Sequence, residues 1–491
     1  MKSIIYLLFF LLVQFSYSQF KDLELGQKTT KESSAKINGK EINYKVITGN
    51  QGLFEEKMPV ASIHYTYYKK KETDLQNRPL LISFNGGPGS ASLWMHLAYT
   101  GPKKLSITDE GFPVQPYGIK DNTHSVLDVA DILYVNPVNT GYSRAFKNDN
   151  GKVDRDKFYG VQADINYLAE WVSLFISRHN RWLSPKFLIG ESYGTTRVSG
   201  LALALQNQQW AYLNGVILVS PTNLGIDRDG PISAGNKLPY FTAASWYHGQ
   251  LPSELQELSL EEVLEKSENF TETELIPSLL VGSSLSESKR VKLAEGYSKY
   301  CGLTMEEILQ NNMNVPYNYF WKNLLKNEEF TVGRLDSRYR GIDRKVAGVR
   351  PDYNAELTSW LHAFTPAANY YFQDYLGLKT DLKYKVFGSV RPWKRKNDNT
   401  GEMLRQAMAV NKNLHVMVQS GYYDGATTYY NAKYTLRHLD HSGKLQDRLD
   451  LKLYKSGHMM YLRSEDLKTA NNDLRNFITG ALKASERPAK Y

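Results

Sequence analysis

The chain has 491 residues, of which 42% are hydrophobic, so it is long enough to form one large domain with an insertion or two domains. Its formal net charge of +9 comes from basic residues that are spread along the chain and mixed with acidic ones, and this argues against nucleic acid as a partner. A single cysteine, Cys301, excludes an intrachain disulfide.

The first 18 residues carry the pattern of a secretory signal peptide. Lys2 precedes an apolar run at 4–13, and residues 15–18 offer a cleavage site ahead of Gln19. The run is shorter than the ~20 residues of a membrane-spanning helix, although an uncleaved anchor is the alternative. Because no second run is as long and apolar, and disulfides are absent, we expect export to a bacterial periplasm or beyond the cell, with no membrane span after signal removal.

Strand-like apolar runs alternate with helical patterns up to residue 224, which predicts an α/β fold with a mostly parallel central sheet flanked by helices. Between 225 and 400 helical patterns dominate, so we expect an inserted helical cap there and an α/β core at 19–224 and 401–491. Trp246, Tyr247 and Tyr339 are candidates for the inner face of the cap, and the alternative is that they belong to its hydrophobic core. In chain order, the expected elements are a hairpin at 36–44, strands at 61–68, 79–84 and 132–135, a helix at 157–177, strands at 187–189 and 213–221, helices at 253–264 and 286–300, strands at 414–419 and 449–454, and a closing helix at 464–484.

The most informative motif has the form G-x-S-x-G and is centred on Ser192, within the segment Gly190-Glu191-Ser192-Tyr193-Gly194. A strand precedes it and a helical run at 198–205 follows, which is the context of a nucleophile elbow. Such a turn strains the serine and lifts its hydroxyl clear of the sheet. A serine hydroxyl needs an adjacent base to act as a nucleophile, so the motif predicts partners elsewhere in the chain.

A glycine-rich loop at 85–89 directly follows the strand at 79–84. In elbow proteins such a loop supplies one backbone N–H of the oxyanion hole, and the residue after the nucleophile supplies the other. We therefore expect Gly87 and Tyr193 to be the donors, with Gly86 as the second choice in the loop. Alone, a loop of this composition is more often a plain turn.

The acid and the base should follow the serine in that order, each at the end of a strand. Asp424 lies in a turn-rich loop after the strand at 414–419, and His458 lies just past the strand at 449–454, whereas His438 and His441 lie in a polar stretch. Asp424 would hold His458 in one tautomer. Each residue alone has an ordinary explanation, but the loop, elbow, acid and histidine together predict an α/β-hydrolase with Ser192, Asp424 and His458 as catalytic residues.

These segments resemble the serine carboxypeptidases of the S10 peptidase family. The similarity lies in residues 85–89, 190–194, 421–424 and 456–459, with a further family segment at 136–143. The resemblance implies a secreted enzyme that hydrolyses C-terminal peptide bonds of peptide substrates through an acyl-enzyme. It also implies that Asn85 and Glu191 bind the C-terminal carboxylate of the substrate, with Gly86 beside them.

The chain departs from the eukaryotic pattern of this family at two places. Ser90 follows the glycine loop where those members have cysteine, and Tyr99 precedes Thr100-Gly101-Pro102 where they have glutamate. That glutamate would share a proton with the elbow glutamate, so Glu191 lacks its usual partner, and a hydrogen bond from the Tyr99 hydroxyl is the expected substitute. Residues 90–97, 238–248 and 333–339 resemble the bacterial branch of the family instead.

Two alternatives stay open. The same triad serves an esterase, another peptidase or an acyltransferase, because fold and triad do not fix the substrate. The second alternative is a binding scaffold without catalytic activity. The presence of all three triad residues, Ser192, Asp424 and His458, argues against it. No metal-ligand or dinucleotide motif is present, so we expect no metal and no cofactor. Activity should depend on a group that titrates near the histidine value of ~6.5.

Overall fold

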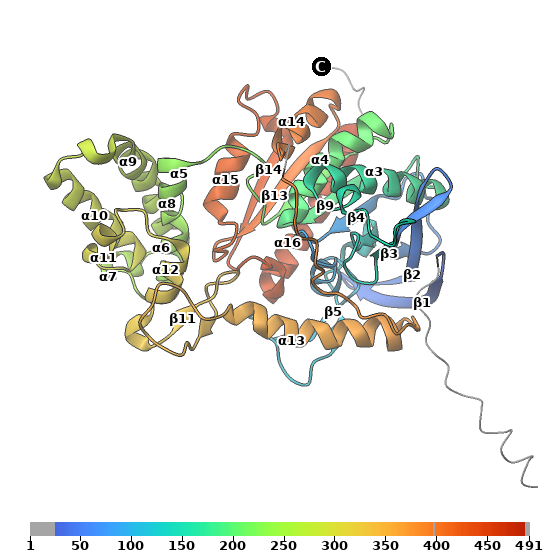
Figure 1. Ribbon diagram of the computed structural model, residues 1–491, viewed down its shortest axis with the longest axis horizontal. Coiled ribbons are helices and arrows are strands. Elements are labelled where there is room, and N and C mark those ends of the chain that lie inside the picture. The colour runs from blue at the N-terminus through green and yellow to red at the C-terminus, as the bar shows by residue number, and fades with distance from the viewer. Residues whose placement is uncertain (1–24, 396–397, 487–491) are drawn as a thin grey trace, which may run out of the picture.

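The computed structural model describes residues 25–395 and 398–486 and is built on a ten-stranded sheet (Figure 1). Its strands are β1 (Lys28–Ile37), β2 (Lys40–Glu55), β3 (Met58–Lys70), β4 (Leu80–Phe84), β7 (Asp131–Val135), β8 (Arg144–Ala145), β9 (Lys186–Glu191), β10 (Gly215–Val219), β13 (His415–Gly421) and β14 (Leu449–Tyr454). They lie in the order β1-β2-β3-β7-β4-β9-β10-β13-β14, with β8 paired to β3. The pairs from β1 to β7 are antiparallel and those from β7 to β14 are parallel, so the α/β prediction is confirmed.

The first hairpin follows from its turn residues. Asn38 and Gly39 connect β1 to β2 with φ angles of 46° and 80°. Asn-Gly is the pair that best tolerates two successive positive φ values, and such turns match the twist of the flanking strands. The hairpin predicted at 36–44 is therefore present, with longer strands than the sequence indicates.

Helices cover both faces of the sheet. They are α2 (Trp94–Ala98), α3 (Val161–Arg178), α4 (Tyr193–Gln208), α13 (Ala355–Asn369), α14 (Thr400–Val410), α15 (Tyr429–Arg437) and α16 (Ser464–Ser485). In β9, Leu188 packs into a core with α3, α4 and α14, whereas Phe187 and Ile189 pack into another with α2, α13 and α16. Central strands that are buried on both faces read as continuous apolar runs, which is why they are recognisable in the sequence.

The segment between β10 and β13 divides into two parts. Residues from 230 to 332 form a helical group that stands apart from the sheet in Figure 1. One apolar cluster lies within this group, and a second is shared with Tyr423, Tyr429 and Tyr430. Its elements are α5 (Gly230–Gly235), α6 (Leu238–Tyr247), α7 (Ser253–Gln256), α8 (Leu260–Phe270), α9 (Ile276–Val281), α10 (Glu287–Cys301), α11 (Met305–Gln310), α12 (Tyr317–Asn323) and the first strand of the pair β11 (Thr331–Val332) and β12 (Arg340–Gly341).

The second part returns to the α/β core, which the expectation of a cap over the whole of 225–400 did not include. Trp360 and Phe364 of α13 join the core that contains Trp94. Farther along, Gly388 N–H donates to the Gly89 carbonyl at 2.7 Å. Residues from 355 to 395 therefore belong to the packing of the core and border the glycine loop.

A small sheet pairs β5 (Lys103–Leu105) with β6 (Ile119–Asp121). The signal peptide predicted at 1–18 lies outside the described residues. Within the described residues, none of the helices combines the length and the apolar character that crossing a membrane requires.

A buried ionic cluster ties the N-terminal ends of β4 and β7 together. Asp131 at the start of β7 is fully buried and accepts hydrogen bonds from Arg78 Nε at 3.1 Å and Arg181 Nη1 at 2.6 Å. The N–H of Lys70 in β3 donates to the same carboxylate at 3.0 Å. One carboxylate is thus the shared ion-pair partner of two buried guanidinium groups and fixes three segments to one another.

Removal of this carboxylate should be strongly destabilising. Asp131→Ala leaves two buried cations without a counter-charge, and breaking a buried pair in this way costs about 3–5 kcal/mol. Urea unfolding followed by circular dichroism measures the loss. Glu32→Ala, which removes an exposed ion pair with Lys71, is the matched control and should change stability little. Equal effects of the two substitutions would contradict the assignment.

Candidate active site

Ser192 occupies a strained turn between β9 and α4. β9 ends at Glu191, α4 begins at Tyr193, and Ser192 between them has φ 58° and ψ −126°. A positive φ in a non-glycine residue is costly and persists only where the surroundings impose it. The backbone of Gly194 comes so close to Gly190 that a side chain at Gly190 would collide with it. The turn therefore has the geometry of a nucleophile elbow.

The glycine loop lies in backbone contact with this turn. A Cβ at Gly86 would lie 2.5 Å from the Tyr193 nitrogen and 2.6 Å from the Glu191 carbonyl oxygen, so only glycine fits there. Gly87 follows with a φ of +102°. The buried Arg197 on α4 donates to the Asn85 carbonyl at 2.7 Å and holds the loop in place. The backbone of the glycine loop therefore lies next to the N–H of Tyr193, the first residue of α4.

Asp424 and His458 meet at the ends of neighbouring parallel strands. His458 Nδ1 lies 2.7 Å from Asp424 Oδ2. The carboxylate also accepts hydrogen bonds from the Ala426 N–H at 2.8 Å, the Thr427 N–H at 3.0 Å and the Thr427 hydroxyl at 2.8 Å. With Nδ1 donating to the carboxylate, Nε2 carries the free lone pair. Burial disfavours the imidazolium, but the charge and hydrogen bond of Asp424 outweigh it and raise the pKa of His458 above its ordinary value.

Ser192, His458 and the glycine loop line the same cavity, which has a volume of about 200 Å³. Its remaining walls are aromatic and apolar. The full lining is Gly86, Gly87, Ser90, Trp94, Glu191, Ser192, Arg334, Leu335, Leu357, Trp360, Phe387, His458 and Met459. The lining does not include Trp246, Tyr247 or Tyr339, the candidates for the inner wall of the cap. Tyr339 lies behind the wall, where its hydroxyl receives a hydrogen bond from Trp360 Nε1 at 2.9 Å.

A buried carboxyl group lies beside Ser192. Glu191 Oε1 accepts a hydrogen bond from Asn85 Nδ2 at 2.9 Å, and Oε2 accepts one from the Tyr461 hydroxyl. Burial raises the pKa of Glu191 to about 7, against the opposing effects of His458, Tyr461 and Asn85. The nearby Asp424 adds to the rise. This carboxyl group is therefore protonated over much of the range below neutral pH.

The hydrogen bond expected from Tyr99 comes from Tyr461 instead. The Tyr99 hydroxyl donates to Gln419 Oε1 at 2.6 Å, and its ring stacks on that of Tyr461 with centroids 4.8 Å apart. Both rings are fully buried. Tyr99 thus supports the donor and does not reach Glu191. Tyr461 follows His458 by three residues, and that proximity is the only signal for it in the sequence.

The segment 333–339 binds the loops of the acid and the histidine to each other. The Gly425 N–H donates to the Arg334 carbonyl at 2.9 Å, and the His458 N–H donates to the Leu335 carbonyl at 2.6 Å. The Leu335 N–H in turn donates to the buried Glu356 on α13 at 2.9 Å. Residues 333–339, for which the sequence predicted no role, therefore position the loops that carry Asp424 and His458.

Chemically, the site combines a serine on a strained backbone turn, a histidine oriented by a buried carboxylate and two converging backbone segments. These are the parts of an acyl-transfer site with a serine nucleophile. Within residues 25–395 and 398–486, the histidine, cysteine and acidic side chains form no cluster of three or more that could hold a metal ion.

Comparisons with known proteins point to one family. A family model described as serine carboxypeptidase, Peptidase S10, matches residues 49–467. Serine carboxypeptidase-like 16 of Arabidopsis thaliana is 28% identical over 205 residues, which are 39% of this chain and 43% of that protein. Pheromone-processing carboxypeptidase KEX1 of Saccharomyces cerevisiae is 27% identical over 153 residues, 30% of this chain and 20% of that protein. The matched part spans less than half the length of either relative.

A solved structure extends the likeness of the fold over nearly the whole chain. The crystal structure of a prohormone-processing carboxypeptidase from Saccharomyces cerevisiae superposes with a TM-score of 0.55 and 15% identity, covering 89% of this chain and 91% of that one. At this identity the likeness concerns the fold, which is that of the α/β-hydrolases. Since the family model covers most of the sequence, the chain belongs to the serine carboxypeptidase family, Peptidase S10.

Proposed function

We propose that this protein is an exported serine carboxypeptidase that removes C-terminal residues from peptides through an acyl-enzyme at Ser192. One observation carries the proposal: Ser192, His458 and the buried carboxyl group of Glu191 line a single cavity of about 200 Å³. A nucleophile and its base are thereby placed beside a group that can bind a terminal carboxylate.

In the proposed reaction, the Ser192 hydroxyl attacks the carbonyl carbon of the last peptide bond and passes its proton to Nε2 of His458. Asp424 stabilises the resulting imidazolium. The backbone N–H groups of Gly87 and Tyr193 donate to the oxyanion of the tetrahedral intermediate. The imidazolium then protonates the leaving amine, and water, activated by the same histidine, releases the acyl group from Ser192.

Selection of the C-terminus follows from the protonation of Glu191. A neutral carboxyl group donates a hydrogen bond to the carboxylate of the substrate, whereas an ionised one repels it. Asn85 holds Glu191 in place from one side and Tyr461 from the other. Because the cavity has only about 200 Å³, little of the substrate fits beyond the cleaved bond.

The first test combines active-site labelling with a matched pair of substrates. The wild type should react with a fluorophosphonate and Ser192→Ala should not, while Ser90→Ala, a serine of the same cavity, should still react. An N-blocked dipeptide with a free C-terminus should be hydrolysed with a kcat/KM about a hundredfold above that of its C-terminal amide, because the amide loses charge-assisted hydrogen bonds.

Each failure in this experiment has its own meaning. Equal rates on the acid and the amide would favour another hydrolase activity on the same triad. A folded wild type that does not react with the fluorophosphonate would favour a binding scaffold.

The second test concerns pH. Activity rises as pH exceeds the pKa of His458, since the base must be neutral, and the affinity for a carboxylate substrate falls as pH rises through the pKa of Glu191, about 7. The hydrogen bond from Tyr461 stabilises the ionised form of Glu191. In Tyr461→Phe the pKa of Glu191 should rise further, and the increase in KM should move to higher pH by about one unit.

Tyr99→Phe provides the control for this shift. It removes an equally buried hydroxyl from the ring that stacks on Tyr461, but that hydroxyl contacts Gln419. Its profile of KM against pH should coincide with that of the wild type. If both variants shift the profile alike, the contact between Tyr461 and Glu191 does not control the titration.

A further inference from the structure

Arg334 lies where two cavities meet. It lines the catalytic cavity together with Ser192 and His458, and it also lines a second cavity of about 570 Å³. Its side chain is exposed, while its carbonyl is held by the Gly425 N–H at 2.9 Å. The backbone of this residue is thus fixed beside the loop of Asp424, and its side chain is free to meet a substrate.

The second cavity is basic. Its lining contains Lys237, Arg334 and Arg350 but neither aspartate nor glutamate. The complete lining is Lys237, Pro316, Tyr317, Asn318, Trp321, Arg334, Arg350, Pro351, Asn354, Gly425 and Ala426. Lys237 donates to neutral oxygens, those of the Asn314 side chain at 2.7 Å and the Val315 carbonyl at 3.1 Å.

The two arginines of this cavity are not neutralised by the protein. Among the residues that the structure describes, no carboxylate lies within ion-pair distance of the guanidinium of Arg334 or of Arg350. Arg334 also acts on the catalytic centre, because its charge disfavours the imidazolium of His458. Its guanidinium is therefore within electrostatic reach of the site of the reaction.

The shared residue Arg334 places the two cavities next to each other, so an extended peptide could occupy both. With the C-terminal carboxylate at Glu191 and Asn85, the small catalytic cavity holds the residue that is released. Because Arg334 is the residue that both linings share, the chain on the N-terminal side of the cleaved bond reaches the second cavity if it passes this exposed side chain. The basic cavity continues on the far side of that residue, so upstream side chains would enter it.

We propose that the cavity lined by Lys237, Arg334 and Arg350 is a subsite for acidic residues on the N-terminal side of the cleaved bond, with Arg334 and Arg350 as its specificity-determining residues. This inference rests on the proposed carboxypeptidase function. Arginine suits the role because its planar guanidinium binds a carboxylate through two parallel hydrogen bonds. Since both arginines are exposed, salt should weaken the preference.

The test compares two N-blocked pentapeptides with the same two C-terminal residues and either Glu or Gln at the two positions before them. The readout is the ratio of kcat/KM for the Glu peptide to that for the Gln peptide, taken within each variant. For the wild type at low ionic strength this ratio should be about three to ten. It should fall in Arg334→Gln and in Arg350→Gln, approach one in the double variant, and decrease in 0.5 M salt for the wild type.

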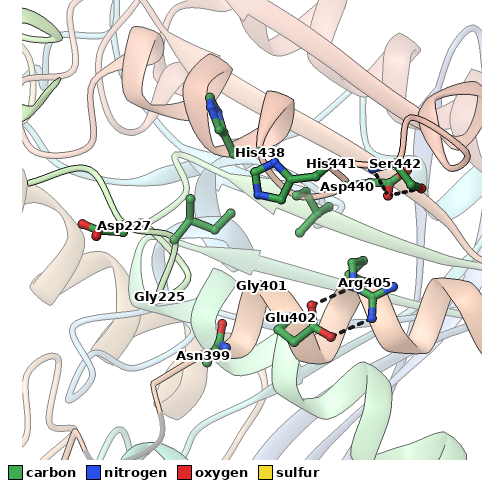
Figure 2. A pocket seen from close by; sticks show the side chains of 12 residues that line it. Gly225, Asp227, Asn399, Gly401, Glu402, Arg405, His438, Asp440, His441 and Ser442 are labelled. Atoms are coloured by element: carbon green, nitrogen blue, oxygen red, sulfur yellow. Dashed lines mark hydrogen bonds and ion pairs between the residues drawn. The ribbon is translucent and has the colours of Figure 1, made fainter.

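A matched control comes from another cavity, shown in Figure 2, that lies between α14 and the residues after α15 and has a volume of about 560 Å³. Its arginine, Arg405, is already paired with Glu402 through hydrogen bonds of 2.6 and 2.7 Å. Arg405→Gln should leave the ratio at its wild-type value.

The outcomes separate this inference from the proposed function. Hydrolysis of both peptides by the wild type with a ratio of one or below overturns the acidic subsite and leaves the carboxypeptidase intact. Hydrolysis of neither peptide overturns the proposed function itself. An equal loss of preference in Arg405→Gln also overturns the subsite, because the effect would then come from net charge alone. Fluorophosphonate labelling and thermal unfolding verify that each variant is folded, and Arg350, which lies outside the catalytic cavity, serves if Arg334→Gln fails to fold.

Discussion

The buried hydrogen bond between Asp424 and His458 is the interaction on which the site depends, and the parallel pairing of β13 with β14 makes it possible. Both strands end at the same edge of the sheet, so the loops that follow them lie side by side. β4 and β9 pair in the same sense, which brings the glycine loop and the elbow to that edge as well. Ligand and catalytic groups gather at the carboxyl ends of strands in open parallel sheets for this reason.

Two buried carboxyl groups flank the histidine, and their surroundings give them different roles. Asp424 receives hydrogen bonds from two backbone N–H groups, a hydroxyl and the imidazole, all of which stabilise its negative charge. Glu191 receives only an amide and a phenol, and burial raises its pKa to about 7. The group with few donors is thus the one that can be a neutral hydrogen-bond donor beside the histidine.

The sequence was sufficient to predict that the residues directly after strands lie together in the site. Ser192, Asp424 and His458 follow apolar runs, and the glycines of the loop at 85–89 mark a close approach of the backbone. It was insufficient where side chains from distant segments meet. Tyr99 and Tyr461 are both buried tyrosines near the site, and only the packing decides which hydroxyl reaches Glu191.

For a related reason, the sequence does not show that residues 355–395 pack on the core and not in the inserted cap. The apolar face of α13 has the same period whether it packs on a cap or on the core, so its pattern does not identify its neighbour. The contact of Phe364 with Trp94 assigns it to the core. Likewise, Trp360 and Phe387 form the cavity wall together with Trp94, although these residues are far apart in the chain.

The segment 333–339 links the choice of substrate to the placement of the base. A Cβ at Gly457 would lie 2.5 Å from the Leu335 carbonyl oxygen, and the same carbonyl accepts the His458 N–H. The position of this segment and the position of the histidine are therefore coupled. Arg334 stands on this support, so its backbone is fixed beside the loop of Asp424 while its exposed side chain stays free to reach a substrate.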